Sequence, residues 1–76
     1  MKKLTDTAAD YTQRLREEYH QLTQRIDRLE STLTAWHELG QAPAAANLPL
    51  METQMHAMKT YQTILRHRAA LDDVEL

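Results

Sequence analysis

Apolar residues recur along the first half of the chain at alternating spacings of four and three positions. They form one stripe with a weaker extension toward the N-terminus: Leu15, Tyr19, Leu22, Ile26, Leu29, Leu33 and Trp36, extended back through Tyr11, Ala8 and Leu4. This alternation places one side chain per turn on the same side of an α-helix and is typical of a coiled-coil seam. It predicts a long helix over about residues 6–39.

The residues that break helices are gathered in one window of the sequence, 40–49. Gly40 suits the position just after a helix end, and Pro43 prevents the helix from continuing. Asn47 can cap a second helix, and Pro49 is tolerated in its first turn because the missing N–H has no partner there. The window therefore predicts that one helix ends and another begins.

These limits define a single domain over residues 1–76, with a linker at 40–48 and a second helix over about 49–71. The tail 72–76 carries three acids at a helix C-terminus, where the helix dipole disfavours them, so we expect the tail to fray. The fold class predicted from this order is all-α, an antiparallel helical hairpin with a long first helix and a shorter second one.

The second helix carries an apolar face that is broader than a single stripe. One stripe consists of Met51, Met55, Met58, Leu65 and Ala69, and it is extended sideways by Leu50, Ala57, Tyr61, Ile64 and Leu71. Together they approach half of the helix circumference, which is wider than one antiparallel partner covers. The face is either the broad core side of a small bundle or two contacts, one with the first helix and one with a second subunit.

The two predicted helices differ in length, about 50 Å for the first and about 33 Å for the second. Folded back from Gly40, the second helix would cover the first only to about Glu17. That leaves four apolar positions without an intrachain cover: Leu4, Ala8, Tyr11 and Leu15. Because two helices alone also bury little apolar surface, we predict a homo-oligomeric helical bundle.

Composition narrows the classes of function. The chain has 76 residues, nine Lys plus Arg against eleven Asp plus Glu, and a formal net charge of −2. This near balance argues against DNA or RNA as a partner, since nucleic-acid binding usually needs a surplus of positive charge. No cysteine is present, which excludes disulfides and thiolate metal sites. No apolar run is long enough for a membrane span, and no signal-peptide core follows Met1, so we expect a cytoplasmic protein without a membrane partner.

Sequence signatures of catalysis and of cofactor or metal binding are missing. There is no glycine-rich phosphate loop and no nucleophile elbow. The histidines of the two helices, His20, His56 and His67, point away from the apolar seams on helical phase and form no recognised ligand spacing. We therefore expect a protein that is not an enzyme and that has no catalytic residue, cofactor or metal.

Cations and aromatic residues line the edges of both apolar stripes. Along the first helix they are Arg14, Arg25 and Arg28 with Tyr11 and Tyr19, and along the second they are Lys59, Arg66 and Arg68 with Tyr61. Arginine forks suit phosphate, and tyrosine offers a stacking face and a hydroxyl, so this mixture can enclose a small anionic nucleotide at a subunit boundary. Alternatively, the cations shield the seam and pair with acids of neighbouring helices.

Two segments together resemble a known family. The first is Tyr11-x-x-Arg14-Leu15-x-x-Glu18-x-x-x-Leu22-x-x-x-Ile26-x-x-Leu29, and the second is Leu50-x-x-x-Gln54-Met55-x-x-Met58-x-x-Tyr61-x-x-Ile64-Leu65-x-x-Arg68. Over about residues 8–70 this order resembles small helical-hairpin proteins encoded by bacteriophages, including crAss-like phages. The run from Met58 to Arg68 is its most distinctive part.

The resemblance implies phage counter-defence in the cytoplasm of the bacterial host. Similar small oligomeric phage proteins include sponges that sequester nucleotide immune signals of the Thoeris and CBASS type. On this resemblance the ligand-binding residues would be Tyr11, Arg14, Arg25, Tyr61 and Arg68. The chain departs from a fuller sponge in being short, in having no separate ligand-binding domain and in its alanine-rich loop.

Two other functions stay open at this point. In one, the exposed seam is a coiled-coil module that pairs with a helix of a host protein and inhibits it, and the adaptable side chains of Met51, Met55 and Met58 would suit such a surface. In the other, the chain is a small structural or assembly component of a phage.

Overall fold

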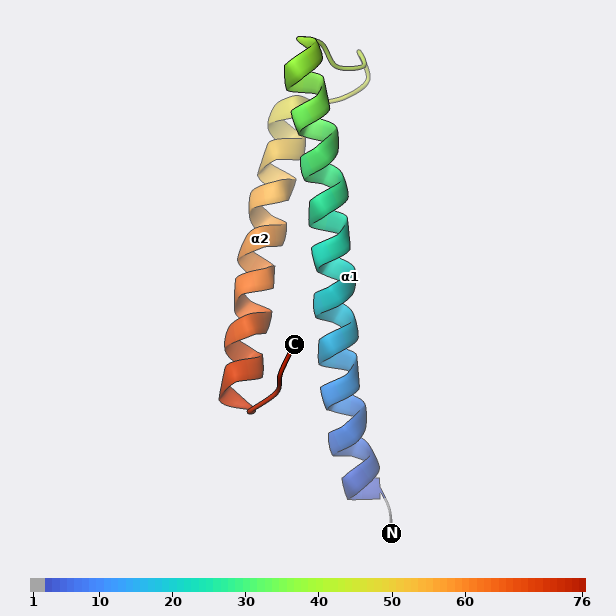
Figure 1. Ribbon diagram of the computed structural model, residues 1–76, viewed down its shortest axis with the longest axis vertical. Helices are drawn as coiled ribbons and strands as arrows, with labels where there is room; N and C mark the ends of the chain where they lie inside the picture. The colour runs from blue at the N-terminus through green and yellow to red at the C-terminus, as the bar shows by residue number, and fades with distance from the viewer. Residues whose placement is uncertain (1–2) are drawn as a thin grey trace.

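The computed structural model describes residues 3–76, with side chains from residue 9 onward. Two α-helices, α1 (Lys3–Leu39) and α2 (Leu48–Leu71), run antiparallel and form an elongated hairpin (Figure 1). No strand occurs among residues 3–76. The prediction of an all-α helical hairpin is confirmed.

The loop between the helices is closed by the two residues that the sequence marks. Gly40 lies in the left-handed region, with φ of 71°, and the amides of Gly40 and Gln41 donate hydrogen bonds to carbonyls of the last turn of α1. This is the hydrogen-bond pattern of a Schellman cap, which glycine adopts without a steric penalty. At the other end, Asn47 Oδ1 accepts a hydrogen bond from the amide of Leu50 at 3.0 Å and so caps α2.

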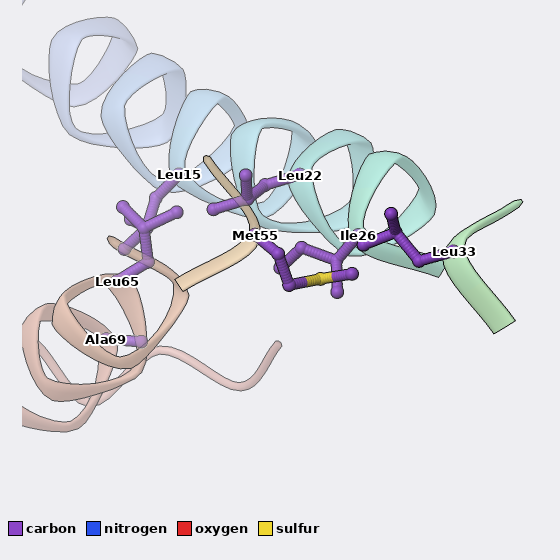
Figure 2. Packing of buried hydrophobic residues seen from close by; sticks show 7 residues of the cluster. All are labelled: Leu15, Leu22, Ile26, Leu33, Met55, Leu65 and Ala69. Carbon is purple, nitrogen blue, oxygen red and sulfur yellow. The ribbon is translucent and has the colours of Figure 1, made fainter. Parts of the chain in front are cut away.

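A single line of apolar side chains lies between the helices (Figure 2). The buried residues are Leu15, Leu22, Ile26 and Leu33 of α1 with Met55, Leu65 and Ala69 of α2. Leu65 is 0% exposed and Leu15 2% exposed, so these two form the tightest layer. Among the side chains described from residue 9 onward, seven buried residues are a small core, as expected of a short domain, which buries a smaller share of its surface.

The second helix was predicted to pack along the first only as far as about Glu17, and the structure shows that α2 packs further along α1 than this. Leu15 was expected to be uncovered but packs in the core with Leu65, and Tyr11 contacts Arg68 of α2. The reason is the path of the loop, which runs back along α1 before α2 begins, so that α2 reaches further toward the start of α1 (Figure 1). The side chains of Leu4 and Ala8, for which the same lack of cover was predicted, lie outside the described residues.

The tail after α2 also differs from the expected fraying. It turns back toward α1, Val74 packs against the core, and Arg16 Nε donates to the carbonyl oxygen of Glu75 at 2.8 Å (Figure 1). The turn uses a second cap of the Schellman type, in which Asp73 adopts a positive φ of 58° and the Val74 amide donates to the carbonyl oxygen of Ala69. This cap and the contact of Val74 offset the unfavourable charge of the acidic tail.

Among the described residues, neither helix combines the length and hydrophobicity that crossing a lipid bilayer requires.

Candidate binding site

The two long sides of the hairpin differ in chemistry. On one side, which we call the laddered face, four polar contacts connect the helices: Glu52 with His37 at 3.5 Å, Lys59 with Glu30 at 3.0 Å, Gln62 with Thr23 at 2.9 Å, and Arg66 with Tyr19 at 3.2 Å. These contacts occupy Lys59 and Arg66, so on this side the cations shield the seam, as the alternative interpretation of the sequence predicted.

The other side, which we call the arginine face, carries all five predicted ligand-binding residues. Tyr11 and Arg68 contact each other across the two helices on this side. With about 100° of rotation per residue, Arg14 and Arg25 of α1 and Tyr61 of α2 share this side of the core line. Cross-helix contacts therefore involve cations on both faces, Lys59 and Arg66 on the laddered face and Arg68 on the arginine face, while Arg14 and Arg25 are exposed.

The closest group on the arginine face is built by Tyr11, Arg68 and Asp72. The guanidinium carbon of Arg68 lies 5.8 Å from the centroid of the Tyr11 ring, and Arg68 Nη2 donates to the Tyr11 hydroxyl at 3.4 Å. The same hydroxyl donates to Asp72 Oδ2 at 2.8 Å. The hydrogen bond with Tyr11 raises the pKa of the Arg68 guanidinium, which keeps its positive charge. A cation, an aromatic ring and an anion are thus held together where α2 ends.

Tyr61 makes the second contact across this face. Its hydroxyl donates a hydrogen bond to a carboxylate oxygen of Glu18. That bond, followed by burial and by the negative charge of Glu18, raises the pKa of Tyr61 above 10.0. The phenol therefore stays protonated at neutral pH and presents a hydroxyl donor.

Glu18 and Asp72 were not among the predicted site residues. Glu18 is one of the acids of neighbouring helices with which the edge cations were expected to pair, and Asp72 belongs to the tail that was expected to fray. The signal that identifies Glu18 is the helix register, because Tyr11 and Glu18 are separated by seven residues, as are their partners Arg68 and Tyr61. Asp72 has no comparable sequence signal, since its position depends on the path of the tail.

Arg14 and Arg25 lie on the arginine face but apart from one another along it. Both are exposed, and eleven residues of helix separate them, which corresponds to about 16 Å. The register of Tyr11 with Arg68 places Arg25 level with Gln54 of α2. A single chain therefore brings Tyr11, Tyr61 and Arg68 toward one end of the face and leaves Arg25 about 20 Å from Tyr11.

Two surface hollows near the loop are lined by residues other than the five predicted ligand-binding residues. One is formed by Trp36, Leu39, Gln41, Ala42 and Pro43, and another, on the laddered side, by Glu30, Leu33, Thr34, His37, Glu52, Met55 and His56. None of the five predicted residues lines either hollow. In the part of the chain that the structure describes, no group of three or more His, Cys, Asp or Glu side chains is placed to hold a metal ion.

We expect the pKa of Tyr61 to fall toward 10.0 when Glu18 is replaced by glutamine, because the variant removes the charged acceptor that favours the protonated phenol. Tyrosinate absorbance, followed through an alkaline titration in a Tyr11→Phe, Tyr19→Phe background, measures Tyr61 alone. Because the folded-state pKa is the higher one, the contact stabilises the fold below pH 10.0, and this stabilisation is lost as the pH rises through the folded-state value. An unchanged titration in Glu18→Gln would contradict the contact.

Comparison with known families adds to this geometry. A family model described as Sequestin matches residues 9–71. The chain belongs to the Sequestin family. The Sequestin match includes the loop, all of α2 and most of α1, and so contains every residue of the predicted site. No curated protein and no solved structure gives a significant match. The name Sequestin indicates a sequestering role, which calls for a binding surface.

Proposed function

We propose that this Sequestin-family chain sequesters a small anionic nucleotide, held on the arginine face between subunits of a homo-oligomer. In this proposal the nucleotide is an immune signal of the bacterial host and the chain is a phage counter-defence protein that withdraws it by binding. One observation carries the proposal: Tyr11, Arg14, Arg25, Tyr61 and Arg68 share one face, on which Tyr11 and Arg68 are in contact across the two helices.

The groups on this face suit a phosphate joined to a base. The guanidinium of Arg68 offers parallel N–H donors that match two phosphate oxygens, and the rings of Tyr11 and Tyr61 offer surfaces on which a base can stack. The hydroxyls of both tyrosines already donate to anionic oxygens, those of Asp72 and Glu18. Phosphate oxygens are acceptors of the same kind, so a bound phosphate would replace these carboxylates without a new type of contact.

The charge of the chain favours a small ligand over a polymer. With a net charge of −2, the surface as a whole does not attract a polyanion. Arg14, Arg25 and Arg68 nevertheless outnumber Glu18 and Asp72, the acids that contact the tyrosines on this face, so the face keeps a positive charge that attracts a ligand with one or two phosphates. Sequestration also needs no chemical step, only a complex that dissociates slowly.

Isothermal titration calorimetry of the purified chain tests this function. The probes are cyclic dinucleotides and cyclic ADP-ribose variants, with the corresponding nucleosides as a matched control without phosphate. We expect binding heat with at least one phosphate-containing probe, weaker binding as salt is added, and no heat with the nucleosides. The absence of heat with every probe at concentrations up to about 1 mM, the weakest affinity useful for capture, would contradict the proposal.

A further inference from the structure

A row of exposed apolar side chains runs along α2 outside the core. Its members lie seven residues apart: Leu50, Ala57, Ile64 and Leu71. Leu50 is 64% exposed, Ile64 47% and Leu71 85%, although all three belong to the large apolar residues that proteins usually bury. A strict spacing of seven keeps these positions on one side of the helix, with a drift of about 20° per repeat. We call them the outer row.

The outer row borders the arginine face. Gln54, Tyr61 and Arg68 also recur every seven residues, and their helical phase places them between the outer row and the core line. Neither α1 nor the returning tail covers the outer row, because three of its large side chains stay exposed with both in place. Whatever covers the outer row therefore also closes the arginine face from the side.

We propose that a second copy of this chain covers the outer row, with the two α2 helices packed antiparallel about a twofold axis between Ala57 and Ile64. This inference names the partner and the surface for the oligomer of the proposed function, but it rests on the exposed apolar residues and does not require a ligand. The need for a partner follows from the core, since only seven of the side chains described from residue 9 onward are buried and three large apolar ones of α2 stay in water.

The outer row is self-complementary when two copies pack antiparallel. Leu50 and Leu71 lie equally far from the midpoint, so Leu50 of one copy faces Leu71 of the other. In the same way, the small Ala57 of one copy faces the larger Ile64 of the other. A parallel pair would instead place Ala57 against Ala57 and leave a gap. It would also bring Arg68 level with Arg68 of the second copy, a repulsion that the antiparallel pair avoids by placing Arg68 within about one residue of the height of Gln54.

The antiparallel pair completes the site that one chain leaves open. On the arginine face, the contacts of Tyr11 with Arg68 and of Glu18 with Tyr61 share one register, which extrapolates to place Arg25 near the height of Gln54. The twofold axis pairs Gln54 of one copy with His67 of the other, so Arg25 of each copy comes to within about one residue of the height of Tyr11 and Arg68 of the second copy. Two equivalent sites result, each about 10 Å along the helix from the twofold axis. The separation of Arg25 from Tyr11 in the single chain thus has a structural explanation.

Disulfide cross-linking tests the orientation, because the chain has no cysteine of its own. In the double variant Ala57→Cys, Ile64→Cys the two thiols of one chain lie about 10 Å apart, too far for an internal disulfide, whereas each faces a thiol of the second copy. We expect oxidation to convert most of this variant to a covalent dimer and less than about one tenth of the single variant Ile64→Cys. Efficient dimer formation by Ile64→Cys alone would overturn the antiparallel arrangement.

Sedimentation tests the interface without cross-links. We expect the native chain to sediment at twice its mass of 8.9 kDa, or at an even multiple of that mass. Ile64→Glu should lower the mass to that of one chain, whereas the neighbouring Thr63→Glu on the other side of α2 should leave it unchanged. A helical native chain that sediments as a monomer at micromolar concentration, or a Thr63→Glu variant that dissociates equally, would overturn the interface.

The two proposals fail in different ways. A monomer that still gives heat with a nucleotide would overturn the outer-row interface and leave sequestration standing. A twofold dimer that gives no heat with any nucleotide would support the interface and contradict the proposed ligand. Binding of the outer row to a helix of another protein would leave the pure chain monomeric, which is again the result that overturns this inference.

Discussion

Replacement of Leu65 by alanine is expected to abolish the folded hairpin at 25 °C. Leu65 is 0% exposed and lies in the layer that includes Leu15 and Ala69. Replacing a buried leucine by alanine lowers the free energy of unfolding by about 2–5 kcal/mol. The loss arises because fewer methyl groups are removed from water on folding and because a cavity remains. A core of seven buried residues leaves little stability to absorb such a loss, because even larger domains are stable by only about 5–15 kcal/mol.

The measurement is far-ultraviolet circular dichroism during urea unfolding at fixed protein concentration, since the stability of a chain that assembles depends on concentration. Leu39→Ala is the matched control: the same substitution in the last residue of α1, where the side chain is 69% exposed, should change stability by less than about 0.5 kcal/mol. If Leu65→Ala unfolds at the same urea concentration as the native chain, the packing of α2 on α1 is not as described.

Most of the fold follows from local signals in the sequence. The stripe from Leu15 to Leu33 marks the buried side of α1, because a helix core needs only one side chain per turn on the same side. Gly40 and Asn47 mark the end of α1 and the start of α2, since the left-handed cap and the side-chain cap each require particular residue types. These features depend on a few neighbouring residues, which a sequence shows directly.

The position of α2 along the axis of α1 does not follow from such local signals. It depends on the path of an eight-residue loop, residues 40–47, and many paths satisfy the same caps. An assumed tight turn at Gly40 left Leu15 uncovered, whereas the structure buries it. The returning tail is a similar case, because its cap uses Asp73 in a left-handed conformation that sequence preferences assign to glycine.

The candidate site, like the fold, could be predicted from the sequence only in part. Helical phase alone places Arg14, Arg25 and Tyr11 on one side of α1, so their shared face could be predicted. Their partners could not, because the contacts of Tyr11 with Arg68 and of Tyr61 with Glu18 require the correct height of α2. Within a single chain Arg25 stays about 20 Å from Tyr11, and no pattern within one helix specifies a contact between them.

Replacement of Arg68 by alanine is expected to weaken nucleotide capture at least about 100-fold, while Arg66→Ala changes it by no more than about twofold. The two arginines are a matched pair. Each lies on α2 with its guanidinium carbon 5.8 Å from the centroid of a tyrosine ring of α1, Arg66 over Tyr19 and Arg68 over Tyr11. They differ in face, because Arg66 belongs to the laddered face and Arg68 to the arginine face.

The size of the expected effect follows from the charge-assisted contacts that Arg68 offers. Loss of a guanidinium that binds a phosphate removes about 3 kcal/mol, which corresponds to a factor of about 100 or more in the dissociation constant. Arg68→Lys keeps the charge but not the fork and should fall between the native chain and Arg68→Ala. Calorimetry with the tightest-binding nucleotide provides the measurement, and sedimentation of each variant verifies that assembly is unchanged.

The pair separates specific capture from general attraction by positive charge. Both substitutions remove one positive charge from α2 and one contact between an arginine and a tyrosine, so they alter net charge and cross-helix packing alike. If nucleotides bound through the overall charge of the chain, the two variants would lose affinity equally. Equal losses would therefore contradict a site on the arginine face, whereas a loss confined to Arg68→Ala supports contact with that face. Because Arg68 is also the more buried of the two arginines, unchanged helicity of Arg68→Ala by circular dichroism is the control for a loss through unfolding.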